Sequence, residues 1–122
     1  MTNHRILLVD DESEFVDTLA ERLYLRGYHA ETVNDGEAAL RSIGDNCPDL
    51  VVLDLKMPGL GGMEVLREIK RFNNLMPVIL LTGHGSTKEG IEGMRQGAYD
   101  YLIKPINIDE LIQKINEAIE GK

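Results

Sequence analysis

The sequence predicts an α/β protein with a doubly wound, five-stranded parallel sheet and five helices. Two observations carry this prediction. Five short apolar runs alternate strictly with five stretches of helical periodicity along the 122 residues, and this alternation is typical of a parallel sheet with helices on both faces. Several of the runs are continuously apolar, which indicates strands that are covered on both sides. Because no linker, repeat or low-complexity segment interrupts the chain, we predict one domain over residues 1–122.

The strands and helices can be assigned in chain order. The predicted strands are the short runs rich in apolar residues, at residues 5–9, 29–33, 50–54, 77–82 and 101–104. The predicted helices are the stretches in which apolar residues recur every three or four positions, at residues 12–26, 36–43, 63–72, 87–96 and 108–120. Each strand is therefore followed by one helix, which is the connection that parallel strands require.

Residues near the helix ends and the apolar helix faces support these assignments. Asp11 and Glu14 have the spacing of a capping box, so we expect Asp11 to cap the first helix, and Asn107 and Glu110 repeat this spacing before the last one. Gly27 is expected to end the first helix. The side chains expected to face the core are Phe15, Val16, Leu19 and Leu23 in the first helix, Ala39, Leu40 and Ile43 in the second, and Ile108, Leu111, Ile112, Ile115 and Ile119 in the last.

Two glycines make the helix at residues 87–96 unusual. Gly90 and Gly93 lie inside it, and a glycine in a helix interior costs about 1 kcal/mol relative to alanine. Two interpretations stay open. Either the glycines permit close packing, or they keep the helix weak so that it can shift between two positions, as switching elements do.

The composition excludes several classes of protein. Acidic residues number 21 against 13 Lys and Arg, for a net charge of −8, so direct binding to nucleic-acid phosphates is not expected. No run approaches the roughly 18 apolar residues of a membrane span, and the opening MTNHRILLVDD does not resemble a signal peptide. The single cysteine, Cys47, cannot form an intrachain disulfide. We therefore expect a cytoplasmic protein with no membrane contact.

Polar side chains stand at the carboxyl ends of the predicted strands, where open parallel sheets bind ligands. They are Asp10, Asp11, Asp35, Asp54, Thr82 and Lys104. One acid in such a position is more often a helix cap, but the whole set at matching strand ends favours a shared site. We expect carboxylates, a hydroxyl and an ammonium group to meet at one edge of the sheet.

A cluster of three carboxylates at this edge predicts a cation site. Clustered carboxylates cannot all stay ionised without positive charge nearby, and Mg²⁺ prefers oxygen ligands. A carboxylate is also a competent nucleophile toward phosphorus, and a cation, a lysine and a hydroxyl can bind the phosphoryl oxygens. These residue types therefore predict phosphoryl transfer onto one of the protein's own aspartates.

Four segments resemble the receiver domains of response regulators in two-component signalling. They are ILLVDDE, DLVVLDLKMPGLGGMEVL, PVILLTG and GAYDYLIKPI, and they span nearly the whole chain in the order and spacing of that family. The resemblance implies a flavodoxin-like sheet of strand order 2-1-3-4-5, which the hydrophobic pattern alone does not determine. It also implies a cis peptide bond before Pro105.

The resemblance assigns a role to each site residue. Asp54 resembles the phosphoacceptor, Thr82 the switch hydroxyl and Lys104 the phosphate-binding lysine. The implied ligands of Mg²⁺, or of Mn²⁺, are Asp10 through water, Asp11 and Asp54 directly, and the backbone carbonyl of Lys56. Tyr101 resembles the switch aromatic. The Lys56 and His84 side chains resemble residues that tune the acyl-phosphate lifetime, but it is equally consistent with the sequence that both are exposed polar residues without a role. Asp35 has no counterpart and is interpreted as a turn residue.

The implied function is a phosphorylation-dependent signalling switch rather than an enzyme. A sensor histidine kinase, a phosphotransfer protein or a small phosphodonor would phosphorylate Asp54. The surface of the fourth helix, fifth strand and fifth helix would then act on an output domain or effector, and a homodimer formed on activation is a further candidate assembly.

Three other functions were compared with this one. A haloacid-dehalogenase-like phosphatase needs a second Asp two residues after the first, where this chain has Lys56. In a flavodoxin-like electron carrier, the acidic DDESE segment at residues 10–14 would repel the FMN phosphate. A receiver-shaped interaction module that is never phosphorylated stays open as the alternative, although the intact acid set argues against it.

Overall fold

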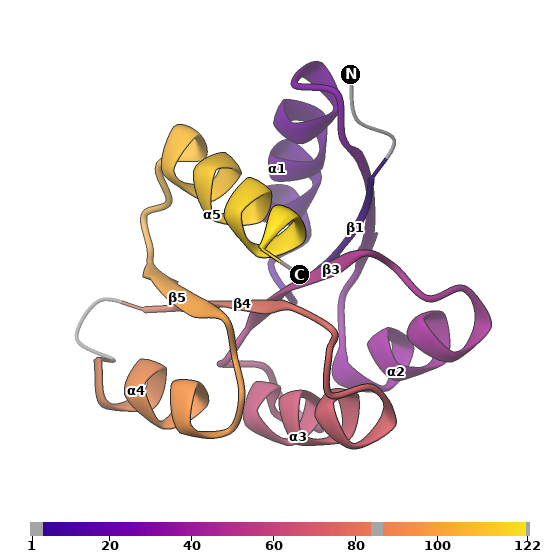
Figure 1. The fold of residues 1–122 in the computed structure, drawn as a ribbon, viewed down its shortest axis with the longest axis vertical. Coiled ribbons are helices and arrows are strands. Elements are labelled where there is room, and N and C mark those ends of the chain that lie inside the picture. The colour runs from indigo at the N-terminus through magenta and orange to yellow at the C-terminus, as the bar shows by residue number, and fades with distance from the viewer. Residues whose placement is uncertain (1–3, 84–86, 122) are drawn as a thin grey trace.

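Five parallel strands alternate with five helices in the computed structural model, which describes residues 4–83 and 87–121 (Figure 1). The strands are β1 (Arg5–Val9), β2 (His29–Val33), β3 (Leu50–Asp54), β4 (Val78–Thr82) and β5 (Asp100–Ile103). The helices are α1 (Ser13–Leu25), α2 (Gly36–Asp45), α3 (Gly62–Phe72), α4 (Thr87–Arg95) and α5 (Ile108–Glu120). The predicted fold class is confirmed.

The strand order is β2-β1-β3-β4-β5, and every neighbouring pair is parallel. This is the order that the resemblance implied. The predicted boundaries hold to within two residues, and the largest difference is that α2 continues to Asp45. The Asn46 backbone N–H still donates to the Ser42 carbonyl at 2.9 Å, which keeps the last turn of α2 closed.

The core lies in two layers, one on each face of the sheet. Helices α1 and α5 cover one face, and α2, α3 and α4 cover the other (Figure 1). Successive residues of β3 alternate between the layers, since Val51 and Leu53 pack toward α2 and α3 whereas Leu50 and Val52 pack toward α1 and α5. All five residues of β3 are buried, which is why this run is continuously apolar up to Asp54.

The predicted inward helix faces are confirmed. Val16, Leu19 and Leu23 of α1 and Leu111 and Ile115 of α5 are buried, and Phe15, Leu40, Ile108, Ile112 and Ile119 are partly buried against the same layers.

Within the described ranges, no helix combines the length and the apolar character needed to cross a membrane.

The capping prediction for Asp11 is wrong. Helix α1 begins at Ser13 with Glu12 as its N-cap residue, and no side chain in the described part of the chain caps it. Asp11 stands one position before the cap, so capping-box spacing alone did not locate the start of the helix. The predictions for Asn107 and Gly27 are confirmed, because Asn107 Oδ1 accepts the Glu110 backbone N–H at 3.0 Å and Gly27 has a φ of 93° after the end of α1.

The glycines of α4 are explained by close packing. A Cβ at Gly90 would lie 2.5 Å from the Tyr101 ring, and one at Gly93 would lie 2.1 Å from Leu80 Cδ1. These separations are far below van der Waals contact, so only glycine lets α4 approach β4 and β5 this closely. The structure therefore supports the packing interpretation, whereas the mobility of the helix stays a prediction.

Candidate functional site

Three aspartates meet at the carboxyl end of the sheet, as the strand ends predicted. Asp10 follows β1, Asp11 is the next residue, and Asp54 ends β3. One carboxylate oxygen from each lies within 4.8 Å of the others. Asp10 and Asp54 are only 1% and 4% exposed, whereas Asp11 faces solvent. Asp35 is not part of this group, because its carboxylate caps α2 by accepting the Ala38 backbone N–H at 2.7 Å.

Burial and the neighbouring acids change the titration of Asp54. The pKa of Asp54 is raised from 3.8 to about 6 in total. Burial is the larger cause, and the nearby Asp10 carboxylate is the second. The Lys104 ammonium and the Lys56 backbone N–H, which donates to Asp54 Oδ1 at 3.4 Å, act in the opposite direction. The site therefore carries more negative charge than its own cations balance, and additional positive charge is favoured there.

Lys104 lies directly after β5 and brings the only ammonium group that contacts this cluster in the described chain. Its Nζ is 3.0 Å from Asp10 Oδ2 and 3.8 Å from Asp54 Oδ1. Its shortest ion pair is with Glu12 Oε1, at 2.7 Å. Burial alone would lower the pKa of Lys104, but the hydrogen bonds to Glu12 and Asp10, together with the charges of Asp54 and Asp10, raise it. Lys104 thus stays protonated, and its ammonium group connects the end of β1, the start of α1 and the end of β3.

Thr82 ends β4, the strand that pairs with β3 beside Asp54. The Thr82 side chain is fully buried, and its Oγ1 has no hydrogen-bond partner among residues 4–83 and 87–121. A buried hydroxyl without a partner is unfavourable unless a ligand supplies one. The hydroxyl is therefore suited to bind an oxygen of a group attached at the cluster.

The residues assigned to metal binding fit a hard divalent cation. Asp10, Asp11 and Asp54 offer carboxylate oxygens from one small region, and oxygen is the ligand type that Mg²⁺ prefers. Burial and, after it, the Asp10 carboxylate raise the pKa of Asp54, and a cation held by these oxygens would favour the ionised carboxylate. The Lys56 backbone carbonyl stays a predicted ligand.

The remaining predicted residues lie around this cluster. Tyr101 is half-buried in β5 with its ring against Gly90 of α4. The exposed Lys56 side chain pairs with Glu89 of α4 at 3.7 Å, and His84 lies outside the described residues. The Lys104–Pro105 peptide bond is cis, as the resemblance implied.

Sequence reasoning missed Glu12 and Phe15 as neighbours of Lys104. Lys104 Nζ lies 4.6 Å from the centre of the Phe15 ring in addition to its contact with Glu12. Both residues belong to the first helical segment, where Phe15 was interpreted only as a core residue. No signal in the sequence connects them with a lysine about 90 positions later.

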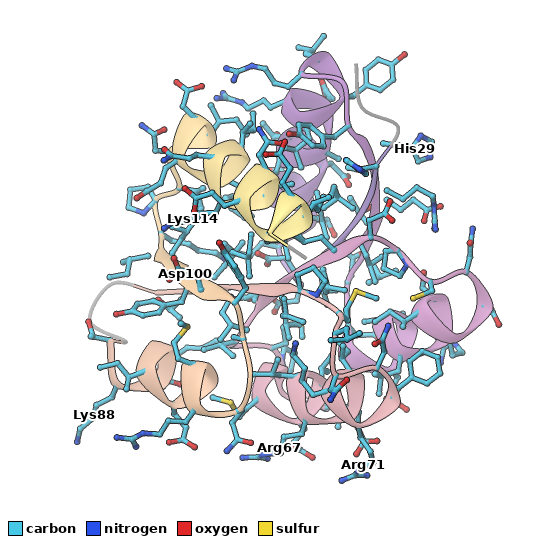
Figure 2. The ribbon with its side chains drawn as sticks, in the orientation of Figure 1. His29, Arg67, Arg71, Lys88, Asp100 and Lys114 are labelled. Carbon is cyan, nitrogen blue, oxygen red and sulfur yellow. The ribbon has the colours of Figure 1, made fainter. Side chains whose placement is uncertain are left out.

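Charged residues on the outer surfaces do not extend the site. Figure 2 shows Arg67 and Arg71 pointing away from the sheet on α3, whereas Asp100 and Lys114 lie together where β5 faces α5. The Asp100–Lys114 ion pair measures 2.8 Å and raises the pKa of Lys114 through a hydrogen bond. These groups lie on faces that the cluster does not reach.

Comparison with known sequences identifies the family. The sequence model of the response regulator receiver domain matches residues 6–116. The chain is 38% identical over 122 residues to the transcriptional regulatory protein PrrA of Mycobacterium tuberculosis, covering 100% of this chain and 52% of PrrA. It is 36% identical over 117 residues to the regulatory protein AtoC of Escherichia coli, covering 96% of this chain and 25% of AtoC. The chain thus spans between a quarter and about half of these relatives.

Solved structures agree with the sequence comparison. NtrX from Brucella abortus, in complex with ADP, superposes with a TM-score of 0.94 at 37% identity, over 98% of this chain and 28% of that one. The isolated receiver domain of the same protein gives a TM-score of 0.92 at 38% identity, over 96% of this chain and 99% of that one. A response regulator receiver domain from Clostridium thermocellum gives 0.93 at 40% identity, over 97% and 95% of the two chains. The chain belongs to the receiver domain family of response regulators, the regulatory switches of two-component signalling.

Proposed function

We propose that Asp54 is the residue that accepts a phosphoryl group, with Mg²⁺ held by the surrounding acids. The observation that carries this proposal is the environment of Asp54. Its carboxylate is 4% exposed and lies beside Asp10 and Asp11, and Lys104 Nζ is 3.8 Å away. The unpartnered Thr82 hydroxyl ends the neighbouring strand. The site thus combines a nucleophile, acids that could hold a cation, and an ammonium and a hydroxyl that can donate to phosphoryl oxygens.

The proposed reaction is a displacement at phosphorus. An oxygen of the Asp54 carboxylate forms a bond to the phosphorus atom, and the bond from phosphorus to the donor breaks with its electron pair leaving on the donor. Asp10, Asp11, Asp54 and the Lys56 carbonyl would hold Mg²⁺ or Mn²⁺, which supplies charge neutralisation for the phosphoryl oxygens when bound. Lys104 and Thr82 each donate to a phosphoryl oxygen. Because Asp54 is buried, little water screens these two interactions, and both are stronger than they would be in solvent.

Phosphorylation would then shift the surface formed by α4, β5 and α5. An acyl phosphate adds about one unit of negative charge and new acceptor oxygens in place of the carboxylate. Thr82 and Lys104 are drawn toward these oxygens, and Tyr101, which lies in β5 with its ring against α4, turns inward. A change from 1% to 99% of the active form needs about 5.5 kcal/mol of differential stabilisation, so a partial shift of the equilibrium is as plausible as a complete one.

The partners follow from this role. A sensor histidine kinase, a phosphotransfer protein or a small phosphodonor supplies the phosphoryl group, and a downstream output domain or effector reads the shifted surface. The α4–β5–α5 surface is also available for a homodimer on activation. The chain assists its own phosphorylation and dephosphorylation and converts no other substrate.

Intact mass spectrometry after incubation with acetyl phosphate and Mg²⁺ tests the assignment. We expect one phosphoryl adduct in the wild type, none in Asp54→Asn, and an unchanged adduct in Asp35→Asn, which replaces another strand-end acid outside the cluster. Addition of EDTA should abolish the adduct. A wild type that gains no phosphoryl group from acetyl phosphate or from a histidine kinase would instead support an interaction module that is not phosphorylated.

A further inference from the structure

The Lys104 ammonium group is held by contacts outside the three-aspartate cluster. Its shortest contact is Glu12 Oε1 at 2.7 Å, compared with 3.0 Å to Asp10 and 3.8 Å to Asp54. The Phe15 ring lies 4.6 Å from the same nitrogen, within the range of a cation–π interaction. Lys104 therefore lies closer to Glu12 at the start of α1 than to Asp54.

Glu12 stands at the start of α1, but its side chain serves the contact with Lys104 and does not cap the helix. Glu12 is the N-cap residue of α1, yet in the described chain its side chain makes no capping bond to that helix. Its backbone N–H instead donates to Asp10 Oδ1 at 2.9 Å, which fixes the residue beside the cluster. The Glu12 carboxylate is thus directed to Lys104 rather than to the helix that it begins.

Fold stability does not explain the contact. The Glu12 side chain is 63% exposed, and ion pairs with an exposed partner add little to the stability of a fold. An ammonium group has three protons to donate, and in this structure Asp10 and Glu12 accept two of its hydrogen bonds. The third proton stays available, but Nζ is 3.8 Å from Asp54 Oδ1 and must move to bind a phosphoryl oxygen there, and the 2.7 Å contact with Glu12 opposes this movement.

We propose that Glu12 is a positioning residue that holds Lys104 away from Asp54 and so limits phosphorylation of this domain. This inference rests on the proposed function of Asp54. Before phosphorylation, Glu12 keeps the ammonium at the edge of the site. When a phosphoryl group arrives, Lys104 exchanges Glu12 for a phosphoryl oxygen, and the cost of that exchange reduces both the rate of transfer and the affinity for any phosphoryl-like ligand.

Two matched variants separate this contact from simple charge. Glu14→Gln removes one negative charge from the first turn of the same helix, where Glu14 is exposed and, in the described chain, forms no ion pair with Lys104. Glu12→Asp keeps the charge but shortens the side chain by one methylene, so it weakens the contact with Lys104. If only the negative charge near the entrance mattered, Glu14→Gln would match Glu12→Gln and Glu12→Asp would match the wild type.

The experiment measures the rate of acetyl phosphate-dependent phosphorylation by intact mass and the affinity for beryllofluoride with Mg²⁺ by calorimetry. We expect Glu12→Gln to raise both by roughly two- to fivefold, the factor that an exposed ion pair of ordinary strength represents. Glu12→Asp should raise both by less, and Glu14→Gln should leave the affinity unchanged. Beryllofluoride affinity is the readout that loss of a purely structural contact would not move.

The outcomes distinguish the inference from the function on which it rests. Equal rates and affinities for Glu12→Gln and Glu14→Gln, in a wild type that is phosphorylated on Asp54, overturn the role of Glu12 alone. A wild type that forms no adduct with any donor overturns the proposed function, and the role of Glu12 with it.

Discussion

Gly90 of α4 lies so close to Tyr101 of β5 that a Cβ built at position 90 would be 2.5 Å from Cδ2 of the ring. Two further ring atoms would lie 2.7 Å from that carbon. In its present position the Tyr101 ring fills the space beside Gly90, so this position of the ring and a side chain at residue 90 exclude each other. The residue assigned as the switch aromatic is therefore in direct contact with α4.

Gly90→Ala should destabilise the protein. Overpacking costs about 1–3 kcal/mol, which exceeds the gain of about 1 kcal/mol from helix propensity. Gly44→Ala is the matched control, because Gly44 lies in α2 and nothing lies within 4 Å of a Cβ at that position. Urea unfolding should show lower stability for Gly90→Ala and higher stability for Gly44→Ala, and an equal stabilisation in both would contradict the packing seen here.

The titration of Asp54 predicts how stability depends on pH in the absence of Mg²⁺. The pKa of this carboxyl is raised from 3.8 to about 6 in the folded chain, first by burial and then by Asp10. The folded state therefore holds a proton that the unfolded state has released, so stability falls as pH rises from about 4 through about 6. The contribution of the neutral carboxyl is complete below the unfolded pKa and lost above the folded one.

Asp54→Asn cannot ionise at this position and should remove this dependence. Relative to the wild type it should gain on the order of 2 kcal/mol between pH 4 and pH 7.5. Urea unfolding at several pH values without Mg²⁺ measures the difference, with the exposed Asp45→Asn as a control. A constant difference between Asp54→Asn and the wild type over this range would show that Asp54 titrates normally.

Mg²⁺ should stabilise the folded chain, and EDTA should reverse the effect. A ligand that binds only the folded state at 100 times its Kd adds about 2.7 kcal/mol. Asp11→Asn should weaken this response, because it removes a charged ligand from an exposed position without disturbing the core. Asp35→Asn should retain the full response, since Asp35 caps α2 instead of joining the cluster. The same Mg²⁺-dependent shift of the melting temperature in Asp11→Asn and wild type would remove Asp11 from the ligand set.

Helix capping should distinguish three residues that precede helices. Asp35 and Asn107 each accept a backbone N–H from the first turn of their helix, so replacing either by Ala should cost about 1 kcal/mol. Glu12 makes no such bond in the described chain, so Glu12→Ala should cost clearly less. Chemical denaturation of the three variants makes the comparison, and a loss at Glu12 as large as that at Asp35 would indicate a cap that the structure does not show.

Lys56 should influence the lifetime of the acyl phosphate without being required for its formation. Its side chain is exposed two residues after Asp54 and reaches Glu89 on α4 at 3.7 Å, and the resemblance to receiver domains implies that this position flanks the path of the attacking water. Lys56→Ala should change the decay rate of the adduct, followed by intact mass after donor removal. Lys88→Ala, a lysine that points into solvent from α4 (Figure 2), is the control. Unchanged decay in both Lys56→Ala and His84→Ala would exclude this role.

The contribution of the sequence differs between the elements and the contacts of the site. Residues 50–54 predicted a buried strand because all their side chains are apolar up to Asp54, and β3 has those bounds. The meeting of Asp10, Asp11 and Asp54 followed from the strand assignments, since parallel strands bring their carboxyl ends to one edge. The cap at Asn107 was also predictable, because it depends on atoms three residues apart.

The capping prediction for Asp11 failed on a detail of local geometry. Capping-box spacing occurs wherever suitable residues stand three positions apart, and it does not identify which residue leaves the helical conformation. In this chain the backbone enters the helix at Ser13, one residue later than the spacing implied. Just before that start, the Glu12 backbone N–H donates to Asp10 Oδ1 at 2.9 Å.

The sequence by itself therefore determined the elements, and it determined which edge of the sheet gathers Asp10, Asp11 and Asp54. Hydrophobic periodicity is a property of each short segment, so it identifies the strands and helices. The common direction of parallel strands then brings their carboxyl ends to one edge. Only the tertiary structure decided that Lys104 binds Glu12 across 92 positions and that Gly90 receives the Tyr101 ring. Such contacts depend on how closely separate elements pack, and no pattern within a short segment records that distance.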